Sequence, residues 1–124
     1  MKVAVTVCDN KISPSFDSTY KFTIIHINNG KIKDKEEIVL FTINPIQRVN
    51  DIADMYIDTI ICGEINQYTL SCLVKEGINV IPGVIGSAKE VVNLFLIGKL
   101  KPRITIFPDG KIIYRRSYYL KLNT

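Results

Sequence analysis

The chain has 124 residues, of which 47% are hydrophobic and 23% are charged, a balance typical of one globular domain. This composition excludes a disordered chain and a collagen-like repeat, and 3 cysteines are too few for a disulfide-rich scaffold. The net charge of +4 is uneven, because residues 99–124 carry 7 Lys/Arg and one Asp while residues 1–98 carry 9 Lys/Arg and 11 Asp/Glu.

The N-terminal segment is predicted to be a strand and not a targeting signal. Residues 2–8 are apolar at nearly every position, as expected of a strand buried on both faces. The segment lacks the apolar region and the small-residue cleavage site of a signal peptide. No apolar run in the chain reaches the ~18 residues that a membrane helix needs. We therefore expect a cytoplasmic protein with reduced thiols and no membrane contact.

Two further strands are predicted over residues 20–27 and 31–40, after a loop at residues 9–18. The intervening Asn28-Asn29-Gly30 is a tight-turn signal, because Asn and Gly tolerate positive φ values. A short turn of this kind joins antiparallel strands, so the two form a hairpin. The second strand is the more polar of the two and is expected near an edge of the sheet.

The rest of the chain alternates helices with short strands. Asn44 and Ser87 have the residue types of helix N-caps, and Ser87 opens a capping box with Glu90. The last helix has almost no polar face over residues 91–97, which predicts cover on more than one side. We expect residues 102–120 to pack against this helix, in the same chain or across a dimer. The predicted elements are helices at 44–56, 67–76 and 87–98, strands at 58–62 and 78–81, and hairpin strands at 103–107 and 111–115.

This order of elements predicts one mixed α/β sheet with helices on both faces. The first three strands are joined by short links and should be antiparallel, whereas the later strands follow helices and should be parallel. Numbered along the chain, the five strands of the sheet are expected in the order 3-2-1-4-5. That arrangement is the architecture of the ribonuclease H-like fold, to which the C-terminal β-hairpin would be an addition.

Four separated segments resemble the dinitrogenase iron–molybdenum cofactor biosynthesis family. They are the opening MKVAVTV, ISPSFDSTYKF from Ile12, DTIICGEI from Asp58, and GINVIPGVIGSAKEVVNLFLIGKL from Gly77 to Leu100. The resemblance implies a ribonuclease H-like domain at residues 1–100, with residues 101–124 as a basic extension of it. It also implies a non-enzymatic carrier or scaffold for an iron–sulfur or iron–molybdenum-type cluster, working with a cofactor-assembly or acceptor protein.

The chain departs from this family at two places. The loop after the first strand often carries His-Phe-Gly in the family, whereas Ser15-Phe16-Asp17 stands here, without the histidine suited to hold a metal cluster. The glycine-rich turn after the fourth strand appears as Gly63-Glu64-Ile65-Asn66, with one glycine kept. These changes predict a weaker or more labile hold on a cluster.

A ligand site is expected beyond the carboxyl ends of the parallel strands, where the connections diverge. Cys8 and Cys62 end two strands that should be neighbours, and they are the predicted metal-binding thiols. A glycine-lined rim and the N-terminus of the last helix would favour an anion. The predicted cofactor-binding residues around the two thiols are Ser13, Ser15, Phe16, Gly63, Gly83, Gly86 and Ser87. Packing of the cysteines in the core is the competing interpretation, and it is favoured for Cys72.

Two other functions remain open from the sequence. The apolar last helix and the basic hairpin with Arg115, Arg116 and Lys121 could dock a partner protein or a second copy. Asp9 and Glu64 follow neighbouring strands, as the metal-binding carboxylates of nucleases do, but further carboxylates are hard to place. Nucleic acid binding by the short basic tail is not favoured, because it offers a small footprint. His26 is expected to be a packed or edge residue.

Overall fold

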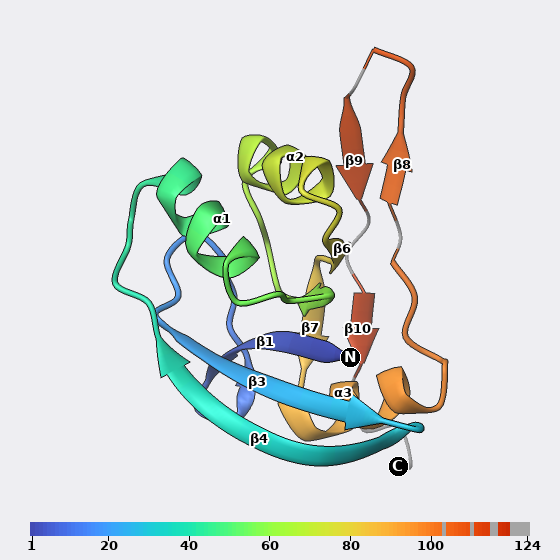
Figure 1. Cartoon of the computed structure of the whole chain (residues 1–124). Helices are drawn as coiled ribbons and strands as arrows, with labels where there is room; N and C mark the ends of the chain where they lie inside the picture. The colour runs from blue at the N-terminus through green and yellow to red at the C-terminus, as the bar shows by residue number, and fades with distance from the viewer. Residues whose placement is uncertain (103, 110, 115–116, 120–124) are drawn as a thin grey trace.

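The fold is built on a six-stranded mixed sheet, seen in a computed structural model that describes residues 1–102, 104–109, 111–114 and 117–119. Five strands lie side by side in the order β4-β3-β1-β5-β6, and β2 pairs with the end of β1 (Figure 1). The β4-β3-β1 pairs are antiparallel, and the β1-β5-β6 pairs are parallel. These strand neighbours are the ones expected from the sequence. The bounds are β1 Lys2–Cys8, β2 Lys11–Ile12, β3 Lys21–Asn28, β4 Lys31–Val39, β5 Thr59–Ile61 and β6 Asn79–Ile81.

The hairpin of β3 and β4 forms where its turn signal stands. Asn29 and Gly30 have φ values of 52° and 74°, the left-handed conformation that this two-residue turn requires. β4 is the edge strand, and charged residues fill it from Lys33 to Glu37. Charged side chains on an edge strand oppose uncontrolled pairing with another sheet.

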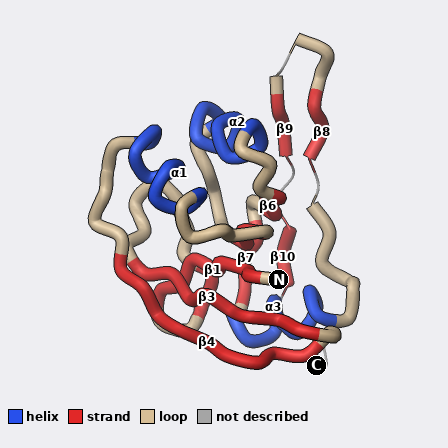
Figure 2. Tube along the Cα trace, viewed as in Figure 1, coloured by secondary structure: helices blue, strands red, loops and turns tan. Residues whose placement is uncertain are grey.

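Helices cover both faces of the sheet, as Figure 2 shows. The side chains of Asn44, Asn66 and Ser87 accept hydrogen bonds from the first turns of their helices, and Asn44 and Ser87 are the two caps predicted from the sequence. The helices α1 (Pro45–Ala53) and α2 (Gln67–Lys75) lie on one face, and α3 (Ala88–Leu96) lies on the other. None of the helices in the described residues is long and apolar enough to span a membrane.

Two clusters of buried apolar side chains form the core, one on each face of the sheet. On the α1 and α2 face the core includes Phe16, Phe22, Ile60, Cys62 and Leu70, all fully or almost fully buried. The core on the α3 face includes Val3, Val5, Ile61, Val91 and Val92. The strand alternation places successive residues in opposite clusters, as it should for strands buried on both faces.

The C-terminal hairpin of β8 (Ile104–Ile106) and β9 (Ile112–Tyr114) packs against α2 and not against α3 (Figure 1). Ile112 is buried in the α2-face core, and the Gln67 side chain donates a hydrogen bond to its carbonyl. The expected cover of α3 by this hairpin within one chain is therefore wrong. Residues 94–96 of α3 are instead partly buried against the apolar core on the α3 face of the sheet.

A short parallel pair completes the described part of the chain. β7 (Val84–Gly86) follows Pro82-Gly83 and pairs with β10 (Ser117–Tyr119). Neither of these two strands was predicted from the sequence. Arg115, Arg116 and Lys121, which the docking interpretation used, lie outside the described residues.

Candidate functional site

The loop after β1 is packed directly onto the turn after β5. Phe16 N–H donates to the Glu64 carbonyl at 2.8 Å, and Glu64 N–H donates to the Pro14 carbonyl at 2.9 Å. A Cβ on Gly63 would lie 2.4 Å from the carbonyl oxygen of Ser13 and 2.7 Å from that of Pro14. Backbone therefore fills the space above Gly63, where the sequence predicts an open crevice.

The two predicted metal ligands occupy different environments. Cys62 is 0% exposed and belongs to the core between the sheet and α2, whereas Cys8 is exposed. Burial raises the pKa of the Cys62 thiol well above its usual range, and the charges of Asp17 and Glu64 act in the same direction. Because the thiolate is the metal-binding form, Cys62 is not poised as a ligand in this conformation. The predicted two-thiol crevice is therefore not formed.

Most of the other predicted site residues form the packed turns at this end of the sheet, and the rest line a pocket. Phe16 is fully buried, Ser13 is almost so, and Ser15 forms a β-bridge with Glu64. Gly83 has a φ of +71° and donates from its N–H to the Gly63 carbonyl at 2.8 Å. These residues and Gly86 shape the turns at this end of the sheet. Among the predicted site residues in the described chain, Cys8 and Ser87 line a pocket.

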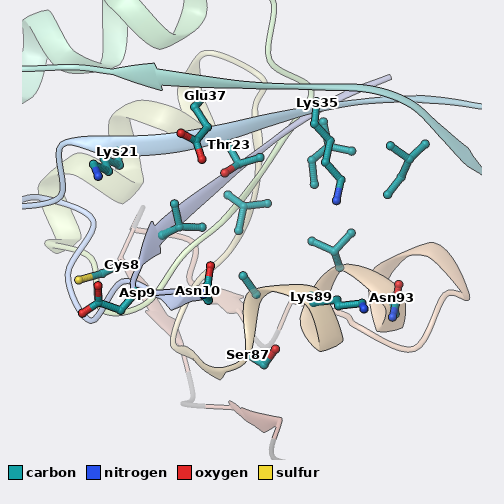
Figure 3. Close-up of a pocket in the computed structure, with 16 residues that line it drawn as sticks. Cys8, Asp9, Asn10, Lys21, Thr23, Lys35, Glu37, Ser87, Lys89 and Asn93 are labelled. Carbon is teal, nitrogen blue, oxygen red and sulfur yellow. The ribbon is translucent and has the colours of Figure 1, made fainter.

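That pocket lies between α3 and the face of β1, β3 and β4, with a volume of about 760 Å³. In Figure 3, Cys8, Asp9 and Lys21 lie toward one end, and Lys35, Lys89 and Asn93 lie toward the other. Its apolar side chains come from the same strands and helix. They are Val5, Val7, Ile25, Ile32, Ala88 and Val92.

The charge of this pocket favours an anion. Three lysines line it against the two carboxylates of Asp9 and Glu37. The N-terminus of α3 contributes less than predicted, because Ala88 N–H already donates to the Asn10 carbonyl at 3.0 Å and Glu90 N–H to Ser87 Oγ at 3.4 Å. The lysines are therefore the main source of positive charge, at both ends of the cavity.

The pocket is poorly suited to coordinate a bare metal ion. In the described part of the chain, no group of three or more His, Cys, Asp or Glu side chains could hold a metal ion. Asp9 lines the pocket, but Glu64 accepts a hydrogen bond from the hydroxyl of Tyr114 at 2.7 Å. The two carboxylates of the nuclease interpretation therefore belong to different surroundings, and that interpretation has no structural support.

Most of the residues that line the pocket were not predicted from the sequence. Lys21, Thr23 and Ile25 share one face of β3, and Glu37 and Lys35 lie opposite Thr23 and Ile25 on β4. The alternation of side chains between the two faces of a strand indicates which residues share a face. It does not indicate that α3 leaves a cavity over that face. The buried Arg48 was missed too, although it lies four residues before the buried Ile52 on the same face of α1.

The chain resembles known proteins over most of its length. A family model described as dinitrogenase iron-molybdenum cofactor matches residues 1–98. The uncharacterized protein MJ0580 of Methanocaldococcus jannaschii is 36% identical over 106 residues, which are 82% of this chain and 90% of that protein. The crystal structure of PH0822 has a TM-score of 0.75 at 25% identity, covering 82% of this chain and 94% of that one.

A more distant likeness concerns the fold alone. The apo form of the orange protein from Desulfovibrio gigas has a TM-score of 0.68 at 18% sequence identity. The match covers 82% of this chain and 91% of that one.

Proposed function

The chain belongs to the dinitrogenase iron-molybdenum cofactor family, and on this premise we propose that it is a non-enzymatic carrier of an anionic iron–sulfur or molybdenum-type cofactor precursor. The family ties the chain to the biosynthesis or binding of that cofactor. The finer role of a carrier is supported by the pocket beside α3. The strand order and the mixed pairing also support the ribonuclease H-like assignment.

The observation that carries the proposal is the exposed thiol of Cys8 at one end of a lysine-lined pocket. Thiolates are the usual protein ligands of iron–sulfur clusters. Lysine ammonium groups attract an anionic cluster without being metal ligands, and the apolar floor gives its sulfur atoms a surface to contact. Cys8 would thus supply one bond to the cargo, and Lys21, Lys35 and Lys89 would supply the electrostatic attraction.

A single protein thiolate suits transport better than permanent storage. A cubane cluster needs four ligands, and the described pocket offers one thiol. The remaining positions would be occupied by ligands that the cargo brings or by a donor or acceptor protein during transfer. Ser15, at the position where the family often carries histidine, is held in the bridge to Glu64 and offers no imidazole. Binding is therefore expected to be reversible.

Loading under strictly anoxic conditions tests this function. The full chain is incubated with ferrous iron and sulfide, and separately with tetrathiomolybdate, then desalted and measured for visible absorption and metal content. We expect a coloured protein with at least one probe. A colourless, metal-free protein with both probes would overturn the carrier function.

Lysine variants test the pocket as the place of binding. Lys21→Ala, Lys35→Ala and Lys89→Ala should each weaken retention of the probe, and added salt should weaken it further. Lys33→Ala is the matched control, because Lys33 lies on β4 and does not line the pocket. Equal retention in all four variants would place the probe elsewhere on the molecule.

A further inference from the structure

The edge strand β4 ends at Val39, and the chain changes character around this end. From Lys33 to Glu37 every residue is charged, but no charged residue occurs from Ile38 to Asn44. Within this stretch Val39, Phe41 and Ile43 are exposed, and the two residues between them are half-buried. Exposure therefore alternates with a period of two, as it does along a strand. We call Val39, Phe41 and Ile43 the apolar stripe.

The stripe is unusually exposed for large apolar side chains. Phe41 and Ile43 are 74% and 75% exposed, and Val39 is 49% exposed. The ring of Tyr20, itself half exposed, lies 5.7 Å from the ring of Phe41 and widens the apolar area. Contiguous apolar surface that continues from an open strand edge is a common place for another chain to add, and the stripe continues β4 in this way.

The backbone of the stripe faces outward as well. Leu40 N–H donates inward to the Tyr20 carbonyl at 2.8 Å, and the Thr42 carbonyl accepts inward from Arg48 Nη1 at 2.8 Å. Because peptide groups alternate along an extended chain, the N–H and carbonyl of Phe41 point away from β3. No hydrogen bond joins them to another residue within the described ranges.

We propose that a second copy of this chain pairs with this edge, antiparallel and with two-fold symmetry centred on Phe41. In such a pair Phe41 lies opposite Phe41 of the second copy, and Val39 lies opposite Ile43 on each side. The stripe is thus complementary to itself, as a two-fold interface requires. The backbone groups of Phe41 would exchange two hydrogen bonds with their counterparts.

Charge selects this register over others along β4. A symmetric antiparallel pair always places one residue opposite its own copy. Centring on any residue from Lys33 to Glu37 would therefore oppose two like charges, which is destabilising. Centring on Val39 would place Glu37 opposite Phe41. Centring on Phe41 leaves residues 38–44 without a charge on either chain. An uncharged segment that is complementary to itself fits a second copy of this chain.

A cysteine placed at the centre tests the register directly. In a Cys8→Ser background, Phe41→Cys places one new cysteine in each copy. The Cα atoms of these two cysteines would lie about 5.5 Å apart, within the range of a disulfide. Val39→Cys is the matched control, because the two copies of Val39 would lie roughly 14 Å apart along the pair. Mild oxidation should cross-link Phe41→Cys and leave Val39→Cys uncross-linked. Equal cross-linking of the two variants would overturn the proposal.

Placing a charge at position 41 tests the dimer without a cross-linking reaction. The full chain should have twice the 14.0 kDa mass of one chain in sedimentation equilibrium at high protein concentration. Phe41→Lys and Phe41→Glu should each be monomeric, whereas their equimolar mixture should regain the dimer mass. Ile97→Lys, at another exposed apolar residue, should remain dimeric. A monomeric wild type, or a dimer that survives both Phe41 substitutions, would contradict the two-fold pair.

Discussion

The guanidinium of Arg48 lies 5.4 Å from the centre of the Phe16 ring and donates from Nη2 to the Phe16 carbonyl at 3.2 Å. It also donates to the carbonyls of Thr19 and Thr42 and lies 5.2 Å from the ring of Phe22. Burial lowers the pKa of this arginine, and the nearby Asp17 partly opposes that shift. One buried side chain of α1 thus holds the loop after β1 against the core.

Replacing Arg48 with methionine should loosen this loop. The substitution leaves three carbonyl oxygens without their charged donor, so we expect the free energy of unfolding to fall by about 2–4 kcal/mol. Urea denaturation measures the loss, and Gln47→Met on the exposed side of the same helix is the control. Arg48→Met should also speed the reaction of Cys62 with thiol reagents, because the loosened loop covers that end of the core. Equal stability of the two methionine variants would show that Arg48 does not anchor the loop.

Gly63 should not tolerate a side chain. The Cβ of Gly63→Ala would meet two loop carbonyl oxygens within 2.7 Å, so we expect a loss of roughly 2–3 kcal/mol as the loop is displaced. Gly77→Ala is the comparison: its Cβ meets nothing within 4 Å, and the cost of its φ of +80° is about 1 kcal/mol. Thermal or urea denaturation of both variants measures the two losses of stability. A Gly63→Ala protein as stable as Gly77→Ala would contradict the tight packing.

The three cysteines should react with a thiol reagent at very different rates. Cys8 is exposed, Cys72 is intermediate, and Cys62 is fully buried with a raised pKa. Labelling followed by mass spectrometry of peptides should therefore find Cys8 modified first and Cys62 protected until the protein unfolds. Labelling of Cys62 as fast as Cys8 in the folded protein would contradict its burial.

The hydroxyl of Tyr114 should make stability sensitive to alkaline pH. Burial raises its pKa to about 12 from 10.0, donation to Glu64 adds to the rise, and the hydrogen bond with the backbone of Ile65 opposes it. The folded state therefore favours the neutral phenol. This contribution is complete below pH 10 and is lost as the pH rises from 10 toward 12.

Tyr114→Phe removes that contribution. The stability difference between wild type and Tyr114→Phe, measured by urea denaturation, should shrink across this pH range. Tyr56→Phe, at a residue that is 82% exposed, is the control and should follow the wild type. A constant difference between wild type and Tyr114→Phe would contradict the pKa shift.

Local signals in the sequence were sufficient for most of the fold. The Asn29-Gly30 turn sets the β3–β4 hairpin, and the capping residues Asn44 and Ser87 start the first and last helices. Each of these signals depends on a few adjacent residues. The order of the sheet then follows from short links between antiparallel strands and helical crossovers between parallel ones.

The candidate site was harder to predict because it depends on packing between distant segments. Cys62 directly follows β5, close to the strand end expected for it, but the backbone of Ser13 and Pro14 packs over Gly63 and closes the crevice. The pocket beside α3 is made by side chains of three strands and one helix. No sequence spacing shows that these elements leave a cavity, whereas the exposed strand end at Cys8 was visible from its position.

The effect of Cys8 on cargo loading is the most direct measurement of the carrier function. Wild type, Cys8→Ser, Cys62→Ala and Cys72→Ser are loaded anoxically with iron and sulfide or with tetrathiomolybdate, and bound metal is measured after desalting. We expect Cys8→Ser to lose most of the bound metal and the visible absorption, because it removes the one thiol in the pocket. Cys72→Ser and Cys62→Ala should load like the wild type. If Cys8→Ser retains as much metal as Cys72→Ser, the pocket at Cys8 is not the carrier site.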